Sequence, residues 1–428
     1  MLTFIVFILV LSFLIFIHEL GHFLAARKVG VKVHEFSIGF PPKIVSKTIN
    51  GTKYMISWIP LGGYVRLHGQ DPESENPDEP DNYAAKSVTQ RFFILVAGSF
   101  MNFLVALVFM PIVFYMGYNR PAFLEQIPQI GSVTSGSVAE KVGIQKGDQI
   151  LQINGEIVKT WLELQQGLEK VETPTLSIKI QRGEQRTTLS ISSEEFANPT
   201  AFGWNPYVEP TIGEVTVGSP AGLAALQQGD RILSVGGEPL EQWSEITPLI
   251  QKSKGKAIEF VISRKGENLN KLITPQWNDN GKYWLVGINT AKVKFSENFT
   301  DSVKLGVLRI YHLTKATFNF IGDLLTGQAG GNTVGGPIMI AQMVGQAAQT
   351  GLSELFSLIA FISLQLAIFN MLPIPALDGG HILFLVFEKI KGSALSKNFR
   401  FNMQKAGFSL LLLLIIYISV QDGLRLFQ

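Results

Sequence analysis

The stretch FLIFIHELGHFLAARK, residues 13 to 28, joins two features that are seldom combined. No charged side chain occurs from Met1 to Ile17, so this segment predicts a helix that enters a lipid bilayer. His18, Glu19 and His22 then follow in the pattern His-Glu-x-x-His, which is typical of zinc hydrolases. On a helix, residues four apart share a face, so both imidazoles can reach one ion while Glu19 deprotonates the attacking water.

The composition of the whole chain also fits a protein of the membrane. Charged residues make up 16% of the 428 residues, whereas soluble domains carry roughly 25%. The mean hydropathy is +0.23. A net charge of +2 is too small to indicate a nucleic-acid partner. The chain has no cysteine, so any metal must be held by histidines and carboxylates.

Four stretches are apolar enough to predict transmembrane helices, at about residues 2–26, 92–118, 355–372 and 407–420. No Lys or Arg precedes Arg27, so we expect the first stretch to remain as a membrane helix and not to be cleaved as a signal peptide. The sequence therefore predicts a multi-pass α-helical membrane protein with four transmembrane helices.

Basic residues in the short loops predict the orientation, because such loops favour the cytoplasmic side. Residues 27–53 hold six Lys and Arg side chains against one acidic side chain, and residues 388–405 hold five against one. Both loops should be cytoplasmic, with both termini and the long segment between the second and third spans outside. The 17 residues before His18 make about 25 Å of helix in a hydrocarbon core of about 30 Å, so the motif should lie near the cytoplasmic face.

The segment between the second and third spans repeats itself. GSVAEKVGIQKGDQILQING, residues 136–155, matches GSPAGLAALQQGDRILSVGG, residues 218–237, at a shift of 82 residues. This phrase resembles the PDZ fold and predicts two extracytoplasmic PDZ-like domains of the α+β class, at 120–206 and 207–292. PDZ domains capture peptide C-termini by strand addition. The alternative is that the two domains bind no peptide and act as spacers or steric filters.

Two histidines leave a catalytic zinc site one protein ligand short, and the candidate lies far along the chain. A carboxylate is a usual third ligand, with the fourth position left to water. In NMLPIPALDGGH, residues 370–381, Asp378 follows two helix breakers, Pro373 and Pro375. Broken backbone at membrane depth is tolerated only against protein or a wet cavity, which is where a ligand loop is expected. On composition alone, Asp378 could equally be a turn residue before two glycines.

HELGH in the first span and NMLPIPALDG in a late span together resemble the motifs of the site-2 protease family of intramembrane metalloproteases. LGGYVRLHG (61–69), VGGPI (334–338) and the tandem PDZ insertion extend the resemblance over essentially the whole chain. A zinc transporter is disfavoured, because the polar candidate ligands cluster in one place.

The resemblance implies roles for individual residues. Zinc would be bound by His18, His22 and Asp378, with Glu19 as the general base. Asn370, which opens the second motif, would hold the backbone of the substrate.

Two further regions are assigned to substrate binding by the resemblance. MISWIPLGGYVRLHG, residues 55–69, alternates and carries a Gly-Gly turn, so it predicts a membrane-associated β-hairpin. Its edge, at Gly62, Gly63 and Tyr64, would meet an extended substrate. Asn102, in the AGSFMN stretch of the second span, would lie near the site. The alternatives are a plain surface hairpin and simple helix packing.

The predicted organisation has five parts: an N-terminal membrane part at 1–119, the two PDZ-like domains, an amphipathic helix with a Gly-rich linker at 293–350, and a C-terminal membrane part at 351–428. The resemblance implies a zinc endopeptidase of the bacterial inner membrane. It would cleave single-span membrane proteins after their external domain has been trimmed, with an anti-sigma factor of an envelope stress response or remnant signal peptides as substrates. A non-catalytic PDZ membrane scaffold is the alternative, but a scaffold has no need of Glu19 beside two spaced histidines.

Overall fold

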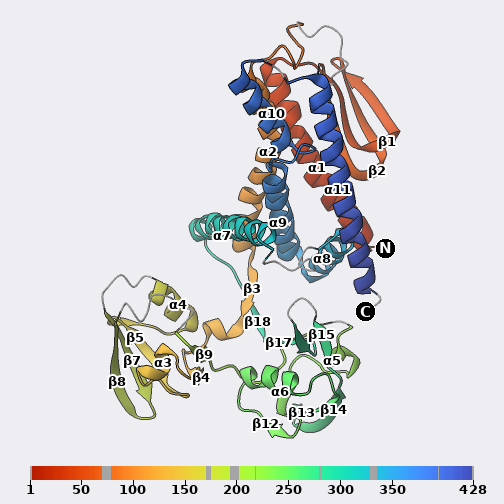
Figure 1. Cartoon of the computed structure of the whole chain (residues 1–428). Helices are drawn as coiled ribbons and strands as arrows, with labels where there is room; N and C mark the ends of the chain where they lie inside the picture. The colour runs from red at the N-terminus through yellow and green to blue at the C-terminus, as the bar shows by residue number, and fades with distance from the viewer. Residues whose placement is uncertain are drawn as a thin grey trace. The chain divides into compact units, whose positions relative to one another are not determined.

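The computed structural model describes residues 2–69, 79–169, 175–192, 202–216, 218–278, 282–327, 335–393 and 395–426. The chain forms two compact units, Met1–Tyr118 with Ser296–Gln428 and Asn119–Phe295 (Figure 1). The first unit consists of helices and one sheet, and the second of short strands and helices. The division of the chain into five parts, with boundaries such as 206/207 and 350/351, remains a prediction.

Four helices among the described residues are long and apolar enough to cross a membrane. They are α1 (Leu2–Val29), α2 (Val88–Met116), α9 (Leu352–Asn370) and α11 (Lys397–Leu426). Each corresponds to one of the four predicted spans, which makes the molecule a membrane protein. α11 begins well before residue 407, because the polar residues that precede its apolar run continue the helix.

α2 is the central helix of the first unit. A capping box fixes its start: the Ser87 hydroxyl accepts a hydrogen bond from the backbone N–H of Gln90, whose side chain in turn accepts from the backbone of Ser87. α2 packs along both α1 and α9 (Figure 1). Its Val105 joins Leu14 of α1 and Ile359 of α9 in one buried apolar cluster. Close van der Waals packing of these apolar side chains holds the three helices together.

Three further helices belong to the first unit: α7 (Phe299–Leu325), α8 (Pro337–Thr350) and α10 (Asp378–Lys391). α7 confirms the helix predicted at 301–325, and it runs across the direction of α2 and α9 (Figure 1). α8 was not predicted, because it follows directly on the Gly-rich stretch. Residues 328–334 of that stretch lie outside the described residues.

The sheet of the first unit consists of β1 (Val33–Ile49) and β2 (Thr52–Leu67). A tight turn at Asn50-Gly51 joins them, and both turn residues have positive φ, 50° and 78°, as in the favoured two-residue hairpin turns. Phe36 of β1 lies opposite both Tyr54 and Val65. The two halves of β2 therefore flank the first half of β1.

The prediction that residues 55–69 form a hairpin is wrong, because both halves of this segment pair with β1. Its expected turn, Gly62-Gly63, lies inside β2, where the strand passes from one side of β1 to the other. The physical reason is that Asn50-Gly51 supplies the turn, because both of its residues adopt positive φ. Residues 63–67 consequently form an outer strand of the sheet.

The second unit contains two modules with the same sheet order, β6-β5-β7-β8 in one and β12-β11-β13-β14 in the other. The strands of the first module are β4 (Ile130–Val133), β5 (Gln149–Ile153), β6 (Glu156–Ile157), β7 (Thr175–Arg182), β8 (Gln185–Ser192) and β9 (Trp204–Pro206). Those of the second are β10 (Glu214–Val215), β11 (Arg231–Val235), β12 (Glu238–Pro239), β13 (Ile258–Arg264), β14 (Glu267–Ile273), β15 (Gln276–Asn278), β16 (Tyr283–Leu285) and β17 (Ile288–Asn289). The helices are η1 (Ala122–Glu125), α3 (Val138–Lys141), α4 (Trp161–Glu169), α5 (Pro220–Leu223), η3 (Trp243–Glu245) and α6 (Ile246–Lys252). β3 (Tyr118–Pro121) and β18 (Lys292–Phe295) pair where the chain enters and leaves the unit.

A buried ion pair recurs in both modules at the repeated Gly-Asp step. Asp148 accepts a hydrogen bond from Arg182 at 2.7 Å, and Asp230 accepts one from Arg264 at 2.6 Å. Both carboxylates are at most 1% exposed. Burial alone would raise the pKa of Asp230, but hydrogen bonds from Arg264 and from the Gln227 backbone lower it below its ordinary value. The same interaction at the same place in both modules supports an internal duplication.

Candidate functional site

The structure brings three side chains from opposite ends of the chain together. His18 and His22 lie one turn apart on α1, and their Nε2 atoms are 3.1 Å from each other. Asp378, the first residue of α10, places its Oδ2 atom 3.3 Å from the Nε2 of His18 and 3.4 Å from that of His22. These three were the predicted zinc ligands.

The dimensions of this group fit a small tetrahedral cation. Ligand atoms at about 2.0–2.1 Å from a tetrahedral zinc ion stand about 3.3–3.4 Å apart, and the three separations here are 3.1, 3.3 and 3.4 Å. The Oδ2 atom of Asp378 is buried and has no hydrogen-bond partner among the described residues. This is expected of an oxygen atom that coordinates a metal ion. Three protein ligands leave a fourth position for water or substrate. Zinc binding by these residues remains a prediction.

α2 supports both histidines from behind. The Nδ1 atom of His22 lies 2.8 Å from the carbonyl oxygen of Ile94. Because a carbonyl only accepts, Nδ1 must carry the proton, and the lone pair of Nε2 is left for the metal. The Nδ2 atom of Asn102 lies 3.5 Å from the Nδ1 of His18, so Asn102 contacts a candidate metal ligand. Its predicted role in substrate binding stays a prediction.

Gly98, whose spacing from Asn102 predicts close helix packing beside the site, lies against both histidines. A Cβ atom at this position would lie 2.4 Å from the Nε2 of His22 and 2.8 Å from the Cε1 of His18. Any side chain would therefore occupy the place of the imidazoles. The single signal in the sequence is a small residue one turn before Asn102, which fits close helix packing equally well.

The candidate base, Glu19, lies against the outer strand of the sheet. The backbone of Val65 is hydrogen-bonded to its side chain. A Cβ atom on Gly63 would lie 3.4 Å from the Cγ of Glu19 and 2.9 Å from a methyl group of Ile15. The absence of a side chain at Gly63 thus lets this strand run along α1 beside the base.

Tyr64 and Gly62, the other predicted substrate residues of the sheet, contact residues of β1. The Tyr64 hydroxyl donates a hydrogen bond to Glu35 at 3.0 Å, and burial together with this bond raises the pKa of Tyr64. Gly62 packs on the ring of Phe40, because a Cβ there would be 2.0 Å from a ring atom. Gly63 is therefore the member of this predicted group whose contact with Glu19 the structure describes.

The loop that carries Asp378 is tightly packed. Asn370, the predicted holder of the substrate backbone, is the last residue of α9 and is half-buried. A Cβ on Gly379 would lie 2.2 Å from the carbonyl oxygen of Leu372, and one on Gly380 would lie 2.2 Å from that of Ile374. The two glycines after Asp378 let the start of α10 fold back onto this loop.

A second group of metal-type side chains, His68, Glu79 and Asp81, lies after β2. The Nε2 of His68 is 3.2 Å from Glu79, and its Nδ1 is 3.8 Å from Asp81. Because the two carboxylates face different ring nitrogens, this geometry fits an ion-paired histidine better than a metal site.

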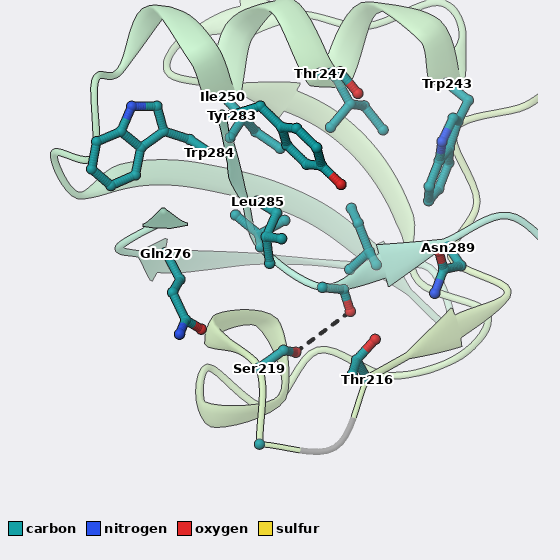
Figure 2. Close-up of a pocket in the computed structure, with 15 residues that line it drawn as sticks. Thr216, Ser219, Trp243, Thr247, Ile250, Gln276, Tyr283, Trp284, Leu285 and Asn289 are labelled. Carbon is teal, nitrogen blue, oxygen red and sulfur yellow. Dashed lines mark hydrogen bonds between the residues drawn. The ribbon is translucent and has the colours of Figure 1, made fainter. Parts of the chain in front are cut away.

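The second module of the outer unit contains a cavity of about 470 Å³ between α6 and the β16–β17 segment (Figure 2). Ile246 and Ile250 of α6 line it from one side, and residues 283–289 line it from the other. In the first module, Trp204 stands at the place of Ile288. Its ring packs on that of Phe202, with the centroids 4.2 Å apart. The second module thus contains a groove at the strand where the PDZ resemblance predicts capture of peptide C-termini.

Known proteins resemble this chain over nearly its full length. The regulator of sigma E protease of Haemophilus influenzae is 36% identical, with 98% of each chain covered. Regulator of sigma-E protease RseP of Escherichia coli and a putative zinc metalloprotease of Pasteurella multocida are each 33% identical, again with 98% of each chain covered. A solved PDZ domain of a Listeria monocytogenes SdrC-like protein covers 20% of this chain and 90% of its own at 20% identity, with a TM-score of 0.18, which establishes no common fold. The sequence model of peptidase family M50 matches residues 6–414, and the chain belongs to this family.

Proposed function

We propose that the chain is an intramembrane zinc endopeptidase of the bacterial inner membrane. The observation that carries the proposal is the convergence of His18, His22 and Asp378 within 3.4 Å, with Glu19 beside them. Both histidines belong to a helix long and apolar enough to span a membrane. Membership of a peptidase family, and a relative named as a putative zinc metalloprotease, support the same chemistry.

Each residue has a definite task in this proposal. Zinc, when bound, supplies Lewis-acid polarisation of the scissile carbonyl and makes water more acidic. His18, His22 and Asp378 hold the ion. Glu19 takes a proton from the attacking water and passes it to the leaving amine. The backbone of Val65 orients the Glu19 carboxylate through their hydrogen bond.

The substrate must be extended before it can be cut, because the hydrogen bonds of an intact helix shield its peptide bonds. Residues 63–67 form an outer strand next to Glu19. We infer that an unwound substrate segment adds to this strand, as extended peptides add to other exposed sheet edges. Asn370 would hold the substrate backbone.

The outer unit would control which substrates reach the membrane site. We infer that its two modules are PDZ-like, face the periplasm and act as a size filter, admitting single-span proteins whose external domain has been trimmed. The groove beside β16 suits the C-terminus that such trimming leaves. Relatives named regulators of sigma E protease make an anti-sigma factor the first substrate class to test.

The decisive experiment compares wild type with Glu19→Gln, using purified full-length protein in detergent and a model single-span substrate. Glu19→Gln should retain zinc and lose activity by about 10²–10⁴-fold, because it removes the base but no ligand. Glu354→Gln, in the first turn of α9, is the matched control and should cleave normally. Full activity of Glu19→Gln would refute the mechanism. A zinc-loaded wild type that cleaves nothing would favour the scaffold.

A further inference from the structure

One face of α2 contacts both helices that carry the candidate metal ligands. Arg91, Ile94 and Gly98 are spaced by three and four residues, so they lie on the same side of the helix. Ile94 and Gly98 contact the histidines of α1. Arg91, one turn earlier, pairs with Glu388 on α10, the helix that begins with Asp378.

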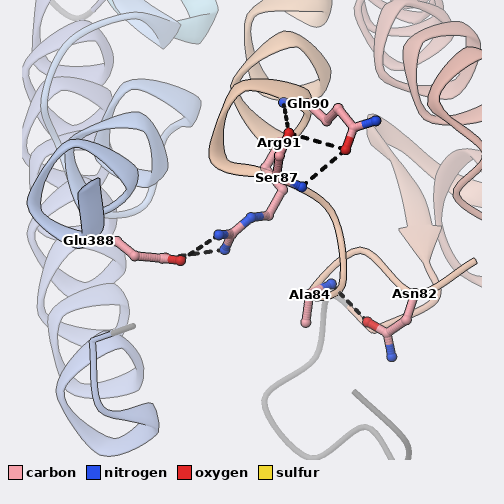
Figure 3. A network of polar contacts seen from close by, with 6 residues as sticks. All are labelled: Asn82, Ala84, Ser87, Gln90, Arg91 and Glu388. Carbon is pink, nitrogen blue, oxygen red and sulfur yellow. Dashed lines mark hydrogen bonds and ion pairs between the residues drawn. The ribbon is translucent and has the colours of Figure 1, made fainter. Parts of the chain in front are cut away.

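The contact between Arg91 and Glu388 is bidentate and largely buried. The Nη1 atom of Arg91 donates to Oε2 of Glu388 at 3.1 Å, and Nη2 donates to Oε1 (Figure 3). The two side chains are 9% and 16% exposed. Two parallel bonds from a planar guanidinium fix the direction of the partner as well as its distance.

The geometry of α10 links this pair to the metal site. Glu388 follows Asp378 by ten residues, which is about 15 Å along a helix. At its other end α10 emerges from a loop with two prolines, Pro373 and Pro375. A rotation or slide of α10 on α2 would therefore displace Asp378 from the histidines, which are held separately by α2.

We propose that Arg91 and Glu388 form the positioning pair of the metal site. By fixing α10 in register on α2, the pair holds the Oδ2 of Asp378 within 3.4 Å of both histidines. α2 is thus a common template on which ligands from the two ends of the chain are aligned. The inference rests on the proposed function, because it concerns the same zinc ligands.

General stability is a poor explanation for this pair. Taking two charges out of water costs free energy that their attraction only partly returns, so a buried ion pair contributes little net stability compared with apolar side chains of the same size. What such a pair does provide is one preferred relative placement of the groups that carry it. That placement is what a three-ligand site assembled from separate helices requires.

The test measures zinc affinity directly, by chelator competition on metal-free full-length protein in detergent, together with the thermal midpoint. Arg91→Met and Glu388→Gln should each weaken zinc binding by about 10- to 100-fold, the range typical of residues that orient metal ligands. The double exchange, Arg91→Glu with Glu388→Arg, should recover most of that loss. Arg120→Met is the matched control, since Arg120 is 5% exposed and pairs with Glu125 in the outer unit. It should lower the thermal midpoint and leave zinc affinity unchanged.

The outcomes separate this inference from the proposed function. Wild-type zinc affinity in Arg91→Met, with or without a lower thermal midpoint, would overturn the positioning role. So would a folded double-exchange variant that binds zinc no better than the single variants. A wild-type protein that binds no zinc would refute the proposed function itself.

Discussion

Replacing Gly98 with alanine should disable the metal site through a single added methyl group. The new Cβ atom would lie 2.4 Å from the Nε2 of His22, 2.7 Å from its Cε1 and 2.8 Å from the Cε1 of His18. Ordinary contact begins at 3.4 Å, so the His22 nitrogen would have to retreat by 1.0 Å, the difference between 3.4 and 2.4 Å.

The surroundings leave little room for that retreat. The ring of His22 is held by the carbonyl of Ile94 at 2.8 Å. The backbones of α1 and α2 already touch, since a Cβ on Gly21 would lie 2.2 Å from the carbonyl oxygen of Ala97. Displacement of a reacting group by about 1 Å costs roughly 10²-fold in rate. Overpacking of this kind lowers the free energy of unfolding by about 1–3 kcal/mol.

We therefore expect Gly98→Ala to fold, to bind zinc at least about 10-fold more weakly, as when a group that orients a metal ligand is disturbed, and to cleave roughly 10²-fold more slowly. The assay is chelator competition for zinc beside cleavage of a model single-span substrate. Gly322→Ala in α7 is the control, because nothing lies within 4 Å of the Cβ that it adds. Wild-type zinc affinity and activity in Gly98→Ala would refute the close approach of α2 to the two histidines.

Four further outcomes are expected. Asp378→Ala should weaken zinc binding and cleavage together, because it removes one of three ligand atoms; unchanged affinity in chelator titration would point to another third ligand. Deleting residues 120–292 should leave hydrolysis intact and permit cleavage of untrimmed substrates, and continued rejection of those substrates would count against the size filter. Since the chain has no cysteine, one introduced in 136–155 should react with an impermeant maleimide from outside, whereas labelling only from the inner face would reverse the topology. Folding lowers the pKa of Asp230. Its contribution to stability is therefore fully present above the pKa of an unfolded aspartate, about 3.9, and is lost as the pH falls through the pKa of the folded protein. Arg264→Met should destabilise the second module at neutral pH, because it removes the guanidinium that pairs with the buried Asp230 carboxylate. Hydrogen exchange should become faster in the second module and not in the first.

The metal motif was predictable because its information is local. Helix periodicity alone places His18 and His22 on one face with Glu19 beside them. Asp378 was found through the resemblance of its motif, since an aspartate before two glycines is also typical of an ordinary turn. Its meeting with the histidines depends on how α10 packs on α2, which no local pattern describes.

The supporting residues could not be predicted for the same reason. Gly98 matters because the imidazoles of another helix occupy the space that its side chain would need. Val65 matters because its backbone, not its side chain, meets Glu19. The small residue at position 98 predicts close helix packing but not which side chains fill the space beside it. An apolar residue in a strand, such as Val65, is ordinary.

The sheet and α8 show how local signals compete. Asn50-Gly51 and Gly62-Gly63 are both plausible turns, and the first one forms because its two residues adopt the positive φ of a tight hairpin. α8 was obscured by the glycines before it. It gains its place by packing on α1, where Gly345 lies so close to Thr3 that a Cβ would be 2.2 Å from the threonine methyl.

The assembly of the metal site from both ends of the chain has a consequence for biosynthesis. The ribosome adds about 5–20 residues per second, so roughly 20–70 s separate the synthesis of His22 from that of Asp378. Throughout that interval the helix with both histidines and Glu19 would lack Asp378, the proposed third ligand. Under the proposed function, proteolytic competence would therefore arise only after residues 120–292 have been translated. On this proposal, a nascent or prematurely terminated chain that lacks Asp378 would be inert toward its neighbours in the membrane.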